Sequence, residues 1–144
     1  MNKWMWIIIA ALALQGCKLG VDQEEDGEIE DVVIDSNTDT SAVVDEEETY
    51  NLIVTGTNNI ITLKGDVSEI NIKGTGNDLI IDSDLLIDKV TISTDSNTIV
   101  VSGALETVIT QLLITGSSNA IEVYDVGTST DTGELNNITE TIQN

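Results

Sequence analysis

Apolar and polar residues alternate with a period of two through most of the chain from Leu52 to Val123. Such alternation predicts β-strands that bury one face and expose the other. The alternating stretches come in pairs, and a short polar phrase that ends in Asn separates the two members of each pair. The pattern therefore predicts repeats made of a strand, a tight turn, a second strand and a longer return. The last Asn residues of the phrases are Asn59, Asn77, Asn97 and Asn119.

The apolar positions keep the same offsets from this Asn in all four repeats. Leu, Ile or Val stands five and seven residues before it and two and four residues after it, which makes sixteen matching positions. Successive Asn residues lie 18, 20 and 22 residues apart. A repeat of about 20 residues that is mostly strand and turn is typical of a solenoid. We predict an all-β fold, namely a short, single-stranded, right-handed parallel β-helix of about four coils stacked about 4.8 Å apart.

The repeated Asn residues fit two structural roles. If their side chains point inward, each amide can bond to the next coil, and a buried amide without partners would cost about 1–3 kcal/mol. If they point outward, they are surface turn residues that tolerate left-handed geometry. We favour the inward ladder. Three residues before the Asn, we expect Gly56, Gly74 and Gly116 to supply a positive φ or a close backbone approach. Thr94 takes that place in the third repeat.

The Gly-x-x-Asn-x-Ile/Val phrase resembles the repeats of the domain-of-unknown-function family 3060. The resemblance covers roughly residues 50–128. Members of that family carry such repeats on short bacterial lipoproteins and are expected to form β-helices. The resemblance implies no known activity, substrate or catalytic residue.

The first residues have the pattern of an export signal. A lysine precedes an apolar run from Trp4 to Leu14, which is too short to span a bilayer. The run ends in Leu-Gln-Gly-Cys, which resembles the bacterial lipobox and implies a signal peptide over 1–16, with cleavage before Cys17 and its acylation by chains such as palmitate. The alternative is an ordinary secretory signal with a chance Cys. By the same resemblance, Lys18 favours the outer membrane, because an Asp there would favour inner-membrane retention.

The distribution of charge distinguishes an acidic N-terminal segment from the rest of the chain. The formal net charge is −21, and residues 17–48 alone hold 13 acidic residues and one Lys. Only two short apolar islands, Val32–Ile34 and Val43–Val44, interrupt this segment. We therefore predict that 17–48 is an acylated Cys followed by a disordered acidic linker. The alternative is a degenerate extra coil around Asn37, which stands 22 residues before Asn59.

The repeat domain is predicted to cover 49–128, and 129–144 is predicted to be a C-terminal cap or tail. This last segment loses the register, because no Ile or Val stands two and four residues beyond Asn137. A short helix or an irregular cap over the open sheet edge is the expectation. Three of its apolar residues have helical spacing: Leu135, Ile138 and Ile142.

Composition excludes several chemistries. The chain has no His and no Arg, and acylation would consume its single Cys. No Ser/His/Asp or Cys/His nucleophile can then be assembled, and phosphate-loop and zinc spacings are missing. Asp82, Asp84 and Asp88 crowd one return, but they do not follow a calcium-loop pattern, so we interpret them as solvated surface. We predict no catalytic residue, metal or cofactor, and the acidic balance argues against nucleic-acid binding.

These observations favour a non-catalytic, membrane-anchored bacterial lipoprotein. Its β-solenoid would serve as a structural or binding module, with a protein or glycan partner that the sequence does not specify. The alternative is a small carbohydrate-active β-helix enzyme, because a pair of carboxylates suffices for glycoside hydrolysis.

Overall fold

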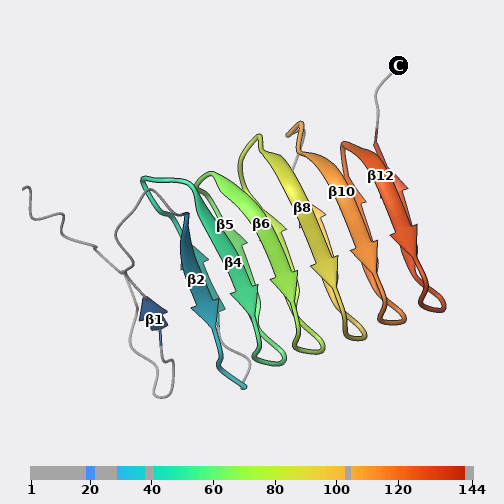
Figure 1. Cartoon of the computed structure of the whole chain (residues 1–144), viewed down its shortest axis with the longest axis horizontal. Coiled ribbons are helices and arrows are strands. Elements are labelled where there is room, and N and C mark those ends of the chain that lie inside the picture. The colour runs from blue at the N-terminus through green and yellow to red at the C-terminus, as the bar shows by residue number, and fades with distance from the viewer. Residues whose placement is uncertain (1–18, 22–28, 38–40, 103–104, 142–144) are drawn as a thin grey trace, which may run out of the picture.

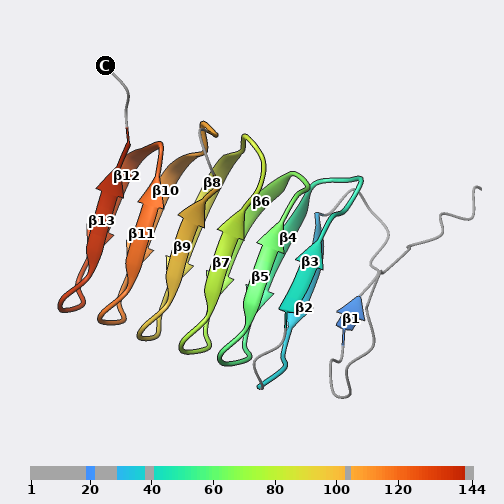
Figure 2. The same cartoon turned by 180° about the vertical axis from the view of Figure 1, so that it is seen from behind.

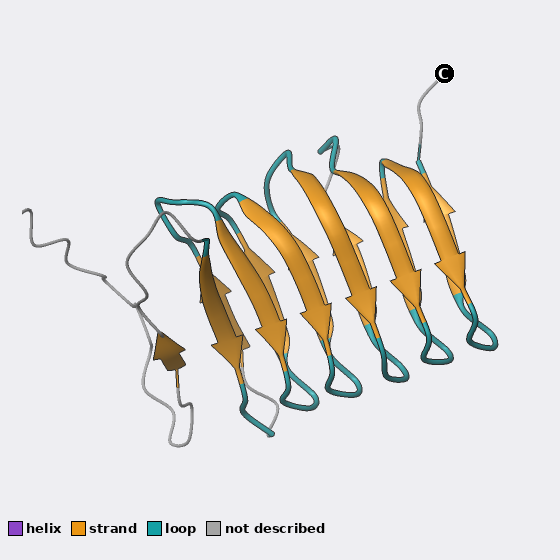
Figure 3. Ribbon diagram, viewed as in Figure 1, coloured by secondary structure: helices purple, strands orange, loops and turns teal. Residues whose placement is uncertain are grey.

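The computed structural model describes residues 19–21, 29–37, 41–102 and 105–141. These residues form 13 β-strands and no helix (Figures 1 and 3). The strands wind into a parallel β-solenoid with two facing sheets, and each coil contributes one strand to each sheet (Figure 2). The predicted all-β solenoid is confirmed.

The seven-stranded sheet holds the first strand of every coil. In spatial order its strands are β1 (Leu19–Val21), β2 (Glu30–Ile34), β4 (Tyr50–Val54), β6 (Val67–Ile72), β8 (Leu86–Ile92), β10 (Val108–Ile114) and β12 (Asp125–Asp131). The six-stranded sheet holds the second strands: β3 (Ser41–Val44), β5 (Ile60–Leu63), β7 (Asp78–Ile81), β9 (Thr98–Val101), β11 (Ala120–Val123) and β13 (Asn137–Glu140). All pairings are parallel except that of β1 with β2.

The hydrophobic core lies between the two sheets, where like residues stack on like residues. Leu79 pairs with Ile61 on one side and Ile99 on the other. Fifteen of the sixteen predicted inward positions are buried, and the remaining one, Val101, is half-buried and packs against the core. Because a one-residue slip would turn every side chain to the other face, this match confirms the register as well as the fold.

The solenoid begins earlier than the sequence predicts. Strands β2 and β3 belong to a first coil, in which Val32 and Ile34 stack on Leu52 and Val54. The prediction of a disordered linker over 17–48 is therefore wrong for the described residues 29–37 and 41–48. The two apolar islands of this segment are its strands, and burying them against an existing sheet edge offsets the cost of ordering the chain.

The alternative, an extra coil around Asn37, predicts the existence of this coil correctly. It assigns the wrong residue to the ladder position. Ile34 pairs with Val54, whereas Ser41 pairs with Ile60, so the first turn is one residue longer than the second. Asn37 consequently lies exposed in the turn instead of taking the ladder position.

The solenoid also continues past the predicted domain end at residue 128. Strands β12 and β13 form a sixth coil, so the predicted helical or irregular cap over 129–144 is wrong for residues 129–141. The repeat phrase is present there as Gly133-x-x-Asn136-x-Ile138, one residue away from the Asn137 that anchored the prediction. Two inward positions of β12 are polar, since Ser129 stands beside Leu112 and Asp131 beside Ile114, whereas Val126 still packs against the core. This more polar final coil reduces the apolar surface at the end of the core.

Candidate functional site

The four predicted Asn residues form a continuous buried ladder at the tight turns between the two sheets. Each is at most 1% exposed, so the inward alternative is confirmed and the surface-turn alternative is wrong. The backbone N–H of Asn77 donates to Oδ1 of Asn97 at 3.0 Å, and its Nδ2 donates to the same oxygen at 3.3 Å. The second Nδ2 hydrogen reaches back 3.0 Å to the carbonyl oxygen of Gly56 in the preceding coil. One amide therefore connects three coils.

The same bonds recur along the molecule in one direction. Asn59 donates to Oδ1 of Asn77, Asn97 donates to Oδ1 of Asn119, and Asn119 donates to Oδ1 of Asn136, with backbone and amide donors at 2.8–3.2 Å. Asn136 is the ladder residue that the sequence reasoning missed. The aligned amides satisfy one another, which is the condition under which buried polar groups stabilise a fold.

Both ends of the ladder are closed by other side chains. Ser36 donates its hydroxyl to Oδ1 of Asn59 at 2.6 Å. At the other end, Nδ2 of Asn136 donates to the carboxylate of Asp131 at 2.8 Å, where a further coil would place another Asn. These contacts leave no ladder amide at either end without a bond, so the ladder is a structural element.

The turn glycines serve the close approach of backbones, which was one of the two expected roles. A Cβ built on Gly74 would collide with the carbonyl oxygen of Gly56 in the coil below. Gly56 and Gly116 face a carbonyl oxygen in the same way. The positive φ angles lie instead at the residue before each ladder Asn: Asn58, Gly76, Ser96, Ser118 and Leu135.

In the fourth coil Thr94 stands at the position of this glycine. Its hydroxyl replaces the bond that the Asn side-chain amide makes to a carbonyl oxygen in the other coils. Its hydroxyl donates to the carbonyl oxygen of Gly74 at 2.7 Å, and it accepts a bond from Nδ2 of Asn97 at 3.2 Å. In the neighbouring coils the Asn amide bonds the equivalent carbonyl directly. A hydroxyl that takes over the bond explains why the glycine is not obligatory at every coil.

Among the residues that the structure describes, Leu135 is the one large apolar residue at a positive φ, with φ 59° and 87% of its surface exposed. A non-glycine residue pays about 1–2 kcal/mol in left-handed geometry, and Asn tolerates it best. We expect Leu135→Asn to raise the free energy of unfolding by about 1 kcal/mol, measured by denaturant titration. Leu135→Ala keeps the strain and should not match this gain. Equal stabilisation by both variants would show that exposure, and not φ, limits this position.

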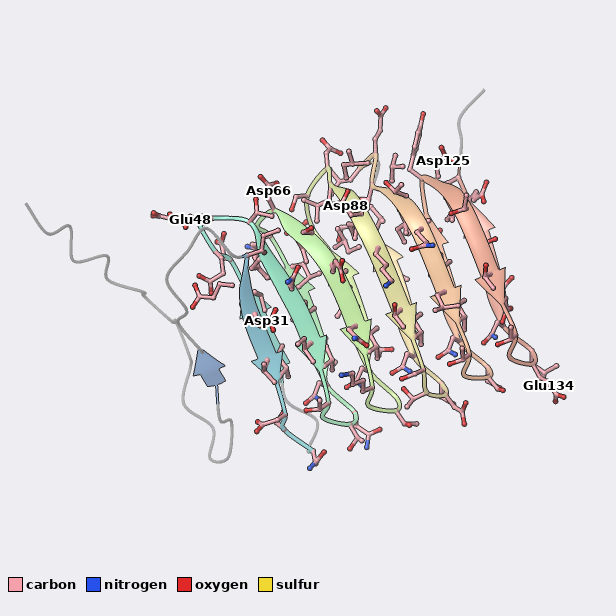
Figure 4. All side chains as sticks on the ribbon, in the orientation of Figure 1. Asp31, Glu48, Asp66, Asp88, Asp125 and Glu134 are labelled. Carbon is pink, nitrogen blue, oxygen red and sulfur yellow. The ribbon has the colours of Figure 1, made fainter. Side chains whose placement is uncertain are left out.

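The edge opposite the ladder carries the returns and is strongly acidic. Figure 4 shows Glu48, Asp66, Asp88 and Asp125 along this return edge, whereas Glu134 lies at the ladder edge. The described carboxylates of the returns and the strand starts beside them are Asp45, Glu46, Glu47, Glu48, Asp66, Asp82, Asp84, Asp88, Glu106 and Asp125, and Lys64 is the cation among them. The return edge therefore presents a field of one sign to solvent.

A hollow of about 280 Å³ opens in this edge where β6 and β8 begin. Its lining includes Asp66, Val67, Ser68, Leu85, Leu86 and Asp88. A β-bulge lies beside the hollow. Tyr50 pairs with Val67 but Asn51 pairs with Glu69, so Ser68 is an extra residue in a β-bulge, and β6 pairs with β8 only from Glu69 onward. Bulges commonly redirect side chains near binding sites.

The three acidic residues that the sequence placed in one return do not meet around a common point. Asp84 accepts a bond from the backbone N–H of Glu106 at 2.7 Å, which ties two returns together. Asp88 lies in β8 and accepts from the Ser68 hydroxyl at 3.1 Å. Within the described ranges, no group of three acidic, His or Cys residues is placed to hold a metal ion. No sequence motif predicts the hollow, because it lies beside a bulge that the alternation pattern does not reveal.

The N-terminal corner of the return edge concentrates charge beside a buried phenol. Burial raises the pKa of Tyr50, and the carboxylates of Glu46, Asp45 and Asp66 raise it further. Its hydroxyl has no hydrogen-bond partner among the described residues. Burial also raises the pKa of Glu46, with smaller contributions from Glu30 and Asp45. The ionised form of Glu46 is therefore disfavoured in the folded state.

A raised pKa in the folded state implies that stability falls as the pH rises through the interval just above 4.5, the ordinary value for Glu46. Glu46→Gln removes this ionisation. We expect the variant to melt at a higher temperature than the parent at pH 7, and we expect the two to converge when the pH falls below that interval. Thermal melts at several pH values measure this, with Glu122→Gln on the outer face of β11 as the control. A pH-independent difference would contradict the assignment.

Comparison with protein-family models, curated proteins and solved structures finds no match for this chain. The resemblance to family 3060 therefore stays a prediction. The predicted lipidation residue, Cys17, lies outside the described residues. Among the residues that are described, no helix is long and apolar enough to cross a membrane.

Proposed function

We propose that this protein is a non-catalytic, lipid-anchored component of the bacterial cell envelope that presents a rigid β-solenoid as a binding module. One observation carries the proposal: with the Tyr50 hydroxyl as an exception, six buried polar side chains of the described residues form hydrogen bonds inside the fold. They are Ser36, Asn59, Asn77, Asn97, Thr107 and Asn119. Polar groups that serve the fold in this way support a scaffold whose function lies on its surface.

The position of β1 supports a particular orientation on the membrane. Cys17 precedes Leu19 by two residues, so their Cα atoms lie within about 8 Å of each other. Because β1 pairs with β2, an acylated Cys17 would hold the N-terminal end of the solenoid near the bilayer. The C-terminal coil would then face away from the membrane. This replaces the long spacer that a disordered linker over 17–48 would provide.

The anchor is tested by labelling and fractionation. We expect labelled palmitate to enter the protein, and we expect Cys17→Ser to abolish the label and release the protein from membranes or leave it unprocessed. Ser102→Ala is a control with no lipid site. A Cys17→Ser protein that is processed and fractionates like the parent would contradict the lipoprotein assignment. Lys18→Asp, followed by separation of the two membranes, tests outer-membrane placement, because it should shift the protein to the inner membrane.

The non-catalytic assignment is tested by incubating the purified chain with a panel of envelope and extracellular glycans. We expect no product above the level of a buffer control. Release of products that Asp66→Asn or Asp88→Asn abolishes would instead establish the carbohydrate-active alternative, since glycoside hydrolysis needs a carboxylate pair.

A further inference from the structure

We propose that the hollow at the return edge binds a lysine side chain of a basic protein partner. The inference rests on the proposed role as a binding module and names the class of partner. It does not depend on the lipid anchor.

One apolar side chain, Leu86, is accessible in the hollow, whose exposed lining is otherwise mostly polar. Leu86 is 69% exposed, because it points outward between the buried Leu85 and Ile87. Val67 and Leu85 line the hollow beside it but are themselves buried. Leu86 therefore provides the surface on which a four-carbon lysine stem can be buried, as lysine stems commonly are on apolar surfaces.

The rim of the hollow is anionic. Asp66 and Asp88 are both exposed and line it from two neighbouring coils. The Ser68 hydroxyl on the bulge holds the carboxylate of Asp88 at 3.1 Å. An ammonium group at the end of a lysine stem would meet these carboxylates while the stem lies on Leu86. The exposed Leu86 and the anionic rim together favour a cation that carries an aliphatic chain.

The surroundings favour a polypeptide over a small amine. Carboxylates continue along the return edge on both sides of the hollow, at Glu47 and Glu48 toward the N-terminal coil and at Glu106 and Asp125 toward the C-terminal coil. A basic segment that lies along this edge would find anionic partners beyond the hollow. Such a field raises the association rate of a basic partner.

The test is binding of a fluorescent octalysine peptide to the full chain in non-ionic detergent, followed by fluorescence anisotropy at about 0.15 M salt. Asp88→Asn is expected to weaken binding by about threefold to fivefold, as loss of one exposed ion pair allows. Leu86→Ser is expected to weaken it by about threefold, because the stem loses about one methylene of apolar burial. Leu86→Met should retain binding, and an octapeptide of acetyl-lysine should not bind.

Two matched controls separate the hollow from the overall charge. Asp78→Asn changes the same residue type on the outer face of β7, and Leu135→Ser removes an exposed leucine at the ladder edge. Both should change the affinity by less than about 1.5-fold, because neither touches the hollow. Equal weakening by Asp78→Asn and Asp88→Asn would overturn the proposal in favour of a general electrostatic attraction.

Three other outcomes would also overturn the proposal. They are an absence of binding by the parent chain, an unchanged affinity in Leu86→Ser, and competition by spermine as effective as competition by unlabelled octalysine. The last outcome would identify a polyamine site instead of a protein-docking site. None of these results bears on lipidation, and loss of the Cys17 anchor would leave octalysine binding intact, so the two proposals fail separately.

Discussion

Replacing Asn77 with Ala is expected to lower the free energy of unfolding by at least about 3 kcal/mol, since each buried group left without a partner costs about 1–3 kcal/mol. The change removes Oδ1 of Asn77, which accepts two bonds that Asn59 donates from its backbone N–H and its Nδ2. It also removes the amide bond to the carbonyl oxygen of Gly56. Three buried groups lose their partners in a place that water does not reach. Denaturant titration of the full chain measures the loss.

The matched control for the ladder is Asn71→Ala, which changes the same residue type on the outer face of the same coil. We expect it to change stability by no more than about 0.5 kcal/mol. A loss at Asn77 no greater than that at Asn71 would show that the stacked amides contribute nothing net. Asn77→Asp is a further check, because it keeps an acceptor while it removes the amide donor and adds charge.

The second large effect is expected in the aliphatic core. Ile99 is fully buried and stacks between Leu79 and Ile121 in the six-stranded sheet. Ile99→Ala should cost about 2–5 kcal/mol, because it removes buried methylene groups and leaves a cavity that layers above and below cannot fill. The measurement is again the free energy of unfolding.

Thr91 is the control for the core, because it lies on the outer face of β8 between the inward Val90 and Ile92. Thr91→Ala should change stability by no more than about 0.5 kcal/mol. If Thr91→Ala and Ile99→Ala destabilise equally, the inward and outward assignment of the strands is incorrect.

The four middle coils were predictable because two independent signals coincide there. Alternating Leu, Ile and Val fix which face of each strand is buried, and a Gly or Thr with an Asn three residues later fixes where the turn lies. The structure places Asn97 and its neighbours as those signals require. These two signals do not decide whether the Asn side chains point inward or outward. The inward orientation follows because each stacked amide can form hydrogen bonds with the amide of the next coil.

The first and last coils were not predictable by the same reasoning, because each keeps only one of the two signals, either the apolar alternation or the turn phrase. Val32 and Ile34 alternate as the pattern requires, but the first turn is one residue longer than the second and has no Asn at the ladder position. Asn136 keeps the turn phrase, but Ser129 and Asp131 replace the apolar residues before it. Residues of both coils form strands because they pair with the neighbouring coil. This pairing is a tertiary contact, which the local sequence pattern does not reveal.

The hollow at the return edge depends on geometry that no motif records. The extra residue Ser68 shifts the register of β6 against β4, and the hollow lies beside it, lined by Leu86 and Asp88. From the sequence, Asp82, Asp84 and Asp88 were placed in one return and interpreted as solvated surface. The sequence did not identify which carboxylates share a surface with an apolar side chain.

The most direct test of a six-coil solenoid held by an inward Asn ladder is amide hydrogen exchange of the full chain, resolved by residue. The backbone N–H groups of Asn59, Asn77, Asn97 and Asn119 donate to side-chain amide oxygens of the following coil. We expect these turn amides, together with the bonded amides of β2 and β13, to exchange as slowly as those of the central strands. Exchange of the four Asn amides at the rate of open turns would contradict the ladder, and unprotected β2 and β13 would contradict the six-coil solenoid.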